Sequence, residues 1–379
     1  MLRERVLPME LTLTAKLMLR PNPEQALILL ETGRAFSKAC NYVSDVVFDT
    51  HNLNQFKLQK ETYGTLRSEY NMPSQMAINA IRHVIGNYRT IRVNQGEWIK
   101  PGYKHTTYPL TWNRDYLLRQ DCFSIGTLRG RLKIPYAVGG MEQYFDGSWT
   151  FGAAKVVNKH GKWYLHISVS KEVESLHDND VSNIVGVDLG INFTAVSYDS
   201  KAKTAFYPGR VVKQCRGQYS KTRKQLQMCQ TPSARRRLKA IGSRENRWMQ
   251  DINHCISKAL VDGNPRGTAF VLEDLTGIRN ATERVRIKDR YVSVSWAFFD
   301  LRKKIEYKAD LYGQKTIVVS PKYTSQTCPK CGHTEKANRN KQTHTFKCKT
   351  CAYMSNDDRI GAMNLHRKGI EYLSAVADG

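Results

Sequence analysis

The chain has 379 residues, with 59 lysines and arginines against 34 aspartates and glutamates, so its formal net charge is +25. This length predicts two or three domains, and the 41% hydrophobic content is enough to build their cores, which excludes a disordered basic tail protein. So large a positive surplus is typical of a protein whose partner is a polyanion, and nucleic acid is the common one. A soluble basic enzyme without such a partner is the alternative.

Neither the N-terminus nor the cysteine pattern indicates export. The first twenty residues lack the apolar run of a signal peptide, and no window approaches the roughly 18 apolar residues of a membrane span. Four of the nine cysteines cluster near the C-terminus and five are scattered, which is typical of a reducing compartment with one metal site. We therefore expect no membrane partner and a cytoplasmic protein, associated with the nucleoid if its source is prokaryotic.

The first hundred residues predict one strand followed by a helical unit. Leucines alternate with polar residues over 11–20, which is the pattern of a half-buried strand. Residues 22–100 then show helical spacing in two segments, the first capped at Asn22 and the second starting after Pro73. The polar face of the second helix is either solvated or in contact with DNA, and it carries Gln75, Asn79, Arg82 and Arg89.

The period changes again downstream of the helical unit. Apolar and polar residues alternate over 128–134 and 163–169, as in strands with one buried face. Together with the first strand, they predict a small antiparallel β-barrel formed by residues 1–21 and 101–180. The helical unit at 22–100 interrupts this barrel.

Three acids mark the C-terminal half as a candidate metal site. Asp188 and Glu273 each end a buried apolar strand, and Asp358 opens a predicted C-terminal helix. Clustered carboxylates repel one another unless a cation neutralises them, and hard cations such as Mg²⁺ prefer carboxylate oxygens. The acids therefore predict a two-metal site for phosphodiester hydrolysis, with Asp188 bridging the metals. The alternative is that each acid caps a turn or pairs with a basic residue.

Two CxxC pairs predict a structural zinc site. Sixteen residues (348 − 331 − 1) separate the pairs, which is the spacing of a four-cysteine zinc ribbon. Four thiolates complete a tetrahedron, so no position is left for a catalytic water. The predicted ligands are Cys328, Cys331, Cys348 and Cys351. We expect the nearby His333 and His344 to be solvated loop histidines.

Residues 201–250 carry fourteen basic side chains and one acid, Glu245. A solvated helix face would mix the two signs, whereas a nucleic-acid backbone is held by positive charge. The predicted contacts are Lys213, Arg216, Lys221, Arg223, Lys224, Arg235, Arg236, Arg237, Lys239, Arg244 and Arg247. We expect Arg244 and Arg247 to lie nearest the acids. A second basic run at 279–290 predicts either a lid over the scissile strand or a plain loop.

These motifs resemble those of the TnpB proteins, transposon-encoded relatives of the compact type V CRISPR effectors. The likeness is carried by Gly186-Val187-Asp188-Leu189-Gly190, by 271–275, by 323–333, and by Asp358 with Ala362-Met363-Asn364. It is strong over 183–366, and the N-terminal half agrees only in the order of barrel and helical unit. The chain departs from the family pattern at Ile360 and Gly361, where Asn and Ala are usual.

The resemblance implies an α/β multidomain fold. A nuclease domain of RuvC type, which is RNase H-like, would take up 181–325 and 355–379, with the zinc ribbon inserted at 326–354. The split barrel would be a wedge domain and the helical unit a recognition unit. Asp188, Glu273 and Asp358 would be the catalytic triad of this nuclease.

By the same likeness, the chain is an RNA-guided, Mg²⁺-dependent DNA endonuclease. Its cofactors would be two Mg²⁺ ions, a structural Zn²⁺ ion and a guide RNA encoded near the gene. Its substrate would be double-stranded target DNA, recognised by base pairing next to a short flanking motif that the protein reads. We expect a monomer with no small-molecule substrate.

Three alternatives stay open at this point. One is a nuclease-poor RNA-guided DNA-binding protein or repressor, which the departures at Ile360 and Gly361 favour. The others are a miniature type V CRISPR effector and a transposase that joins DNA ends.

Overall fold

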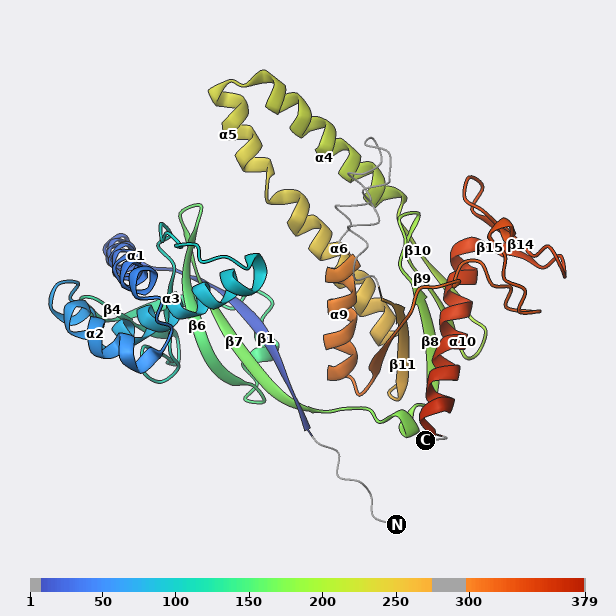
Figure 1. The fold of residues 1–379 in the computed structure, drawn as a ribbon, viewed down its shortest axis with the longest axis horizontal. Coiled ribbons are helices and arrows are strands. Elements are labelled where there is room, and N and C mark those ends of the chain that lie inside the picture. The colour runs from blue at the N-terminus through green and yellow to red at the C-terminus, as the bar shows by residue number, and fades with distance from the viewer. Residues whose placement is uncertain (1–7, 275–297, 378–379) are drawn as a thin grey trace, which may run out of the picture. The chain divides into compact units, whose positions relative to one another are not determined.

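The computed structural model describes residues 8–274 and 298–377, so the basic run predicted as a lid lies outside the described residues (Figure 1). The chain divides into two compact units. The N-terminal unit comprises Glu10–Glu172, and the C-terminal unit comprises the described residues from Val173 onward. None of the helices described is long and apolar enough to span a bilayer.

A seven-stranded, largely antiparallel sheet with the order β2-β6-β7-β1-β5-β4-β3 forms the base of the N-terminal unit. Its strands are β1 (Pro8–Leu19), β2 (Tyr108–Leu110), β3 (Tyr116–Leu118), β4 (Cys122–Thr127), β5 (Gly130–Ala137), β6 (Thr150–Lys159) and β7 (Lys162–Glu174). The sheet curls so that its edge strand β3 reaches β6 on the far side. The contact is a hydrogen bond in which the Tyr116 hydroxyl of β3 donates to the Gly152 carbonyl of β6 at 2.6 Å. The strand order does not join β2 to β3, so closure into the expected barrel stays a prediction.

Three helices lie between β1 and β2: α1 (Pro23–Thr50), α2 (Gln55–Ser68) and α3 (Ser74–Gln95). Asn22 caps α1 as expected, since its side chain accepts from the Gln25 amide at 2.8 Å and the Gln25 side chain accepts from the Asn22 amide at 3.1 Å. Helix α2 was not expected from the sequence, because its buried stripe is narrow and comprises only Leu58, Thr62 and Leu66. Helices and sheet share one hydrophobic core.

The sheet of the C-terminal unit has five strands in the order β10-β9-β8-β11-β12. They are β8 (Asn183–Asp188), β9 (Phe193–Asp199), β10 (Thr204–Pro208), β11 (Thr268–Glu273) and β12 (Lys315–Val319). Strands β8, β9 and β10 pair antiparallel, whereas β11 runs parallel to both β8 and β12. The sheet is therefore mixed, with three antiparallel strands continued by two parallel ones.

Helices cover both faces of this sheet. The helices of this unit are α4 (Arg210–Cys229), α5 (Pro232–Ile241), α6 (Arg244–Asp262), α9 (Phe298–Leu311) and α10 (Asp357–Ala377), of which α6, α9 and α10 pack on the sheet. One face packs against α6 and α9, as in the cluster of Val187, Leu260 and Ile305. The opposite face packs against α10, where Leu365 contacts the cluster that includes Val271. Figure 1 shows α4 leading away from the sheet, with α5 and α6 returning beside it.

A small three-stranded sheet precedes α10. Its strands are β13 (Arg339–Asn340), β14 (Thr345–Lys347) and β15 (Met354–Asn356), in that order. Short 3₁₀ turns occur at Glu142–Tyr144, Asp178–Asp180 and Lys336–Asn338. Phe346 of β14 is fully buried with Cys328, Cys348 and Ile360, so this small sheet shares a core with the first turn of α10.

Candidate metal site and nucleic-acid surface

Two of the predicted acids end neighbouring parallel strands. Asp188 is the last residue of β8 and Glu273 the last of β11, and the register pairs Val187 with Leu272 just before them. Parallel strands end at the same edge of a sheet, so the two carboxylates emerge side by side. Both side chains are partly buried, which leaves this edge accessible.

Helix α10 brings the third acid to the same edge. A Cβ atom at Gly186 would lie 2.1 Å from the Ala362 carbonyl oxygen, so α10 and β8 touch through their backbones. A Cβ at Gly361 would lie 2.9 Å from Cγ of Asp188. The first turn of α10 therefore rests on the Asp188 carboxylate, and this turn carries Asp358, which is 8% exposed.

Burial raises the pKa of all three acids, and at Asp188 the charges of the other two add to this effect. Burial raises the pKa of Asp188 well above its ordinary value, and the charges of Glu273 and Asp358 raise it further. Burial also raises the pKa of Glu273, although the Thr324 hydroxyl, which donates to its Oε1 at 2.5 Å, opposes this. Burial and the neighbouring Asp357 raise the pKa of Asp358. A cation among these carboxylates would relieve the repulsion.

The donor set fits Mg²⁺. Oδ2 of Asp358 is buried and has no hydrogen-bond partner among the described residues, so it is available as a ligand. Carboxylate oxygens at an accessible edge leave room for the waters and phosphate oxygens that Mg²⁺ also takes. Asp188, Glu273 and Asp358 would hold it. Among the described residues, only the four clustered cysteines form a group whose ligand atoms all lie within 4.8 Å of one another.

Arg339 of β13 connects the ribbon to these acids, a contact that the sequence analysis missed. Its Nε lies 2.8 Å from Oδ2 of the fully buried Asp357, and its Nη2 lies 3.7 Å from Oδ1 of Asp358. Arg339 also opposes the rise in the pKa of all three predicted acids. Its sequence neighbours are polar and basic, so nothing in the sequence distinguished it from a solvated residue.

His344 is not the solvated loop histidine that we expected. Its Nδ1 lies 3.6 Å from Oδ2 of Asp357, and its Nε2 lies 2.8 Å from Nδ2 of Asn192. The expectation was wrong because both partners are remote in sequence, one in the loop after β8 and one at the start of α10.

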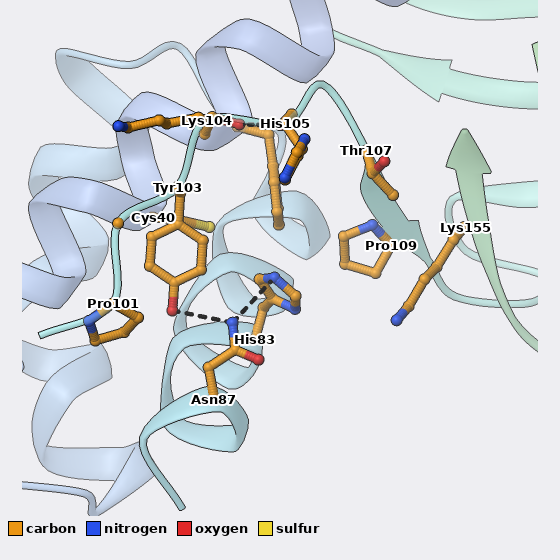
Figure 2. A pocket seen from close by; sticks show the side chains of 13 residues that line it. Cys40, His83, Asn87, Pro101, Tyr103, Lys104, His105, Thr107, Pro109 and Lys155 are labelled. Atoms are coloured by element: carbon orange, nitrogen blue, oxygen red, sulfur yellow. Dashed lines mark hydrogen bonds between the residues drawn. The ribbon is translucent and has the colours of Figure 1, made fainter. Parts of the chain in front are cut away.

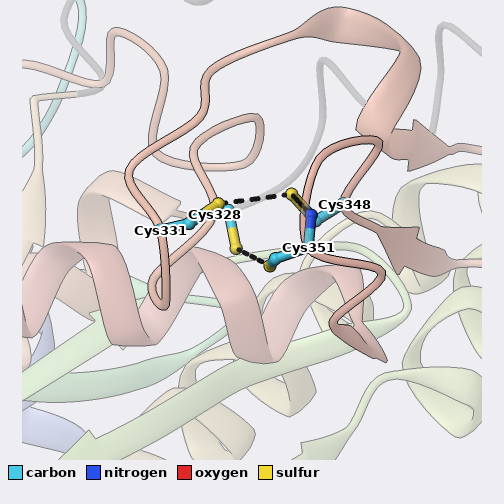
Figure 3. Close-up of side chains that lie close together, drawn as sticks. All are labelled: Cys328, Cys331, Cys348 and Cys351. Carbon is cyan, nitrogen blue, oxygen red and sulfur yellow. Dashed lines mark hydrogen bonds between the residues drawn. The ribbon is translucent and has the colours of Figure 1, made fainter.

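The four predicted zinc ligands come together (Figure 3). The Sγ atoms of Cys328 and Cys351 are 3.6 Å apart, and those of Cys331 and Cys348 are 3.5 Å apart. Four thiols at this spacing match the tetrahedral set that structural zinc takes, so the cluster fits a closed zinc site.

Asn364 fixes the start of the ribbon to α10. Its buried side-chain amide donates to the carbonyls of Thr324 at 2.6 Å and Thr327 at 2.8 Å. Thr324 in turn holds Glu273, so ribbon, helix and strand end are tied together around the acids. Thr324 and Asn364 lie in the segments that carry the family resemblance. That resemblance was the signal in the sequence from which their role near the acids could have been predicted.

The predicted basic contacts differ in exposure. Arg216 is 5% exposed, and Glu245 lies 3.4 Å from its Nε and 2.6 Å from Nη2 of the partly exposed Arg223. These two arginines brace α4 against α6, so we leave Arg216 out of the proposed surface. The exposed ones are Lys213, Lys221, Lys224, Arg235, Arg236, Arg237, Lys239, Arg244 and Arg247.

Fold and site together define an α/β protein with a carboxylate cluster and a four-cysteine ribbon. Residues 166–276 match the OrfB_IS605 family, described as probable transposase, and residues 298–365 match the Cas12f1-like TNB domain. These two matches confirm the resemblance to TnpB-like proteins over residues 166–276 and the likeness to a Cas12f-like TNB domain over 298–365.

Curated relatives agree with this assignment. A CRISPR-associated endodeoxyribonuclease Cas12f1 of Sulfoacidibacillus thermotolerans is 31% identical over 62% of this chain and 57% of its own. A putative RNA-guided DNA endonuclease, InsQ, of Escherichia coli is 28% identical over 62% of this chain and 61% of its own. A TnpB-like protein of Methanocaldococcus jannaschii is 33% identical over 35% of this chain and 46% of its own. The chain thus spans less than two thirds of each of these relatives.

One solved structure has a similar fold across the chain. The cryo-EM structure of a Cas12f1-sgRNA-target DNA complex superposes with a TM-score of 0.59, covering 95% of this chain and 99% of that one. The sequence identity is 13%, so this likeness concerns the fold alone.

Proposed function

We propose that this protein is an RNA-guided, Mg²⁺-dependent DNA endonuclease whose active site is formed by Asp188, Glu273 and Asp358. The observation that carries the proposal is the convergence of these carboxylates at one accessible sheet edge, where the charges of Glu273 and Asp358 raise the pKa of Asp188. The relatives named as RNA-guided DNA endonucleases support it. The substrate would be target DNA next to a short flanking motif, opened by pairing with the guide RNA.

Two Mg²⁺ ions would supply an activated water and neutralise the leaving oxygen during phosphodiester hydrolysis. The charges of Glu273 and Asp358 both raise the pKa of Asp188, so Asp188 would be the ligand that the two ions share. Thr324 holds the Glu273 carboxylate in place, and Arg339 orients the acidic turn at the start of α10. The exposed basic side chains of α4, α5 and α6 would bind nucleic-acid phosphates.

The test begins with the chain purified from cells together with the RNA that stays bound. This RNA is sequenced, and DNA carrying the matching target is incubated with the complex with and without Mg²⁺. Asp188→Ala, Glu273→Ala and Asp358→Ala should each abolish cleavage and leave nucleic-acid binding largely intact, whereas the exposed control Glu174→Ala should cleave normally. Full cleavage by all three variants would end the proposal.

A guided DNA-binding protein without nuclease activity is the second candidate. Its support was the departure from the family pattern at Ile360 and Gly361. Ile360 is fully buried beside Phe346 in the ribbon core, and Gly361 leaves space for the Asp188 carboxylate. Both departures are thus compatible with an intact acid cluster, so the nuclease is the better-supported function. Target binding without any Mg²⁺-dependent product would favour the second candidate.

A further inference from the structure

A cavity of about 310 Å³ in the N-terminal unit has no part in the proposed function (Figure 2). It lies between α1, α3 and the segment 101–109 that leads into β2. The whole cavity belongs to Glu10–Glu172, whereas the three acids and the ribbon belong to the C-terminal unit. The cavity therefore shares no residue with the metal site.

The wall formed by 101–109 is fixed to α1. The Asn41 side chain donates to the Tyr103 carbonyl at 2.9 Å and accepts from the Tyr103 amide at 2.8 Å, as a strand neighbour would. A Cβ at Gly33 would lie 2.1 Å from the Thr106 carbonyl oxygen, so the segment is in backbone contact with the helix. The cavity is preformed, and a ligand would lose little free energy in ordering it.

The interior offers an aromatic face beside polar groups. The rings of Tyr103 and His83 are 5.6 Å apart, and the Asn87 amide nitrogen donates to the Tyr103 hydroxyl at 3.2 Å (Figure 2). Burial and the charge of Lys155 both lower the pKa of His83, so its ring is neutral near pH 7. The Asn87 carbonyl oxygen has no hydrogen-bond partner among the described residues. Amide and imidazole can thus both hydrogen-bond to a flat polar ligand.

The mouth of the cavity is positively charged. Lys155 of β6 is exposed, and Figure 2 shows it extending toward the side of the cavity where His83 lies. It forms no ion pair with any residue that the structure describes, and the lining contains no aspartate or glutamate. The mouth therefore suits an anionic group attached to a ligand held inside.

We propose that this cavity binds one unpaired nucleobase of a nucleic-acid strand, with the adjoining phosphate at Lys155. Bases stack on aromatic rings, and asparagine side chains pair with base edges. A purely apolar ligand would leave the Asn87 carbonyl oxygen without a partner, and a small anion would not contact the aromatic wall. A nucleotide can stack its base on the aromatic wall, pair its base edge with the Asn87 amide and place its phosphate at Lys155.

The strand can be RNA or DNA, and free nucleotides share the same chemistry. The test uses the full chain with two single-stranded decamers, one RNA containing 4-thiouridine and one DNA containing 4-thiothymidine. Ultraviolet cross-linking followed by peptide mass spectrometry should place adducts on 101–109 or on the part of α3 around His83. If adducts form with just one of the two decamers, that kind of strand is the ligand. Competition by millimolar nucleoside monophosphates identifies free nucleotides.

Asn87→Leu removes a base contact and Lys155→Ala a phosphate contact, and each should lower the yield of these adducts about tenfold. Asn94→Leu on the exposed end of α3 and Lys159→Ala on β6 are matched controls and should leave the yield unchanged. If Asn87→Leu unfolds the unit, the exposed Lys155→Ala still gives the readout. Adducts confined to other segments, or parental yields in both cavity variants, would overturn the proposal. Asp188→Ala should cross-link normally, which separates this outcome from a failure of the nuclease proposal.

Discussion

Gly361 of α10 lies directly against Asp188 of β8: a Cβ at this glycine would be 2.9 Å from Cγ and 3.1 Å from Oδ2 of the carboxylate. Gly361→Val should therefore displace the carboxylate and lower Mg²⁺-dependent cleavage about a hundredfold, since an ångström of misplacement has that effect. Gly361→Ala should have a smaller effect, because the Asp188 side chain can rotate away.

The matched control is Gly64→Val on α2, at a glycine where an added Cβ would meet no atom within 4 Å. It should leave cleavage unchanged. A folded Gly361→Val protein that cleaves like the parent would show that the Asp188 carboxylate is not a metal ligand.

Substitutions of the adjacent acids Asp357 and Asp358 should have different effects, one on stability and the other on cleavage. Asp358→Asn removes a proposed metal ligand whose contact with Arg339 is long, at 3.7 Å, so it should abolish cleavage and leave the melting temperature almost unchanged. Asp357→Asn removes the charged partner of Arg339 and should lower the free energy of unfolding by about 2 kcal/mol, the value of a charge-assisted hydrogen bond. Cleavage assays and thermal melts of both variants test this. The reverse pattern would make Asp357 the ligand.

Sequence reasoning could place Asp188 and Glu273 together because acids that end parallel strands meet at one edge. The cysteines could be found because their spacing reflects the chemistry of the ion. Arg216 and Arg339 could not be placed, since Glu245 and Asp357 become their partners only through packing of remote segments. In both cases a basic residue in a basic stretch gives no local sign that it is buried or paired.

The fold of the ribbon should depend on bound zinc, and cleavage by the proposed active site should depend on the folded ribbon. Cys348→Ser removes one of four clustered thiols, so zinc should fall from about one per chain to near zero. Arg339 lies on β13, which pairs with β14 just before Cys348, so its contact with Asp357 should be lost and cleavage should fall with the zinc content. Elemental analysis and cleavage assays measure both. Cys229→Ser, at an exposed cysteine that ends α4, should change neither, and full zinc content in Cys348→Ser would contradict the assignment.

The exposed arginines of α5 should contribute electrostatic binding energy. Replacing Arg235, Arg236 and Arg237 by alanine should weaken RNA binding and flatten the slope of log affinity against log salt by about 2, since each single-strand phosphate contact contributes roughly 0.7. Arg216→Ala should behave differently: it removes a buried partner of Glu245, so it should lower the melting temperature and leave the salt slope unchanged. Titrations at several salt concentrations separate the two. A salt slope unchanged in the triple variant would exclude α5 from the binding surface.

The carboxyl group of Asp310, near the end of α9, should make stability depend on pH. Burial, reinforced by Glu306 and opposed by Lys315, raises its pKa from 3.8 to about 6. The folded state therefore holds this proton more tightly than the unfolded chain, so the stabilisation is full below pH 3.8 and is lost as the pH rises through about 6. Asp310→Asn cannot ionise. After allowance for partial exposure, it should be more stable than the parent by about 1 kcal/mol at pH 7.5, which corresponds to roughly 3 °C in melting temperature. The advantage should vanish near pH 4, and the exposed control Asp251→Asn should show no such trend. An equal difference at both pH values would mean that the Asp310 side chain acts through packing and not through its charge.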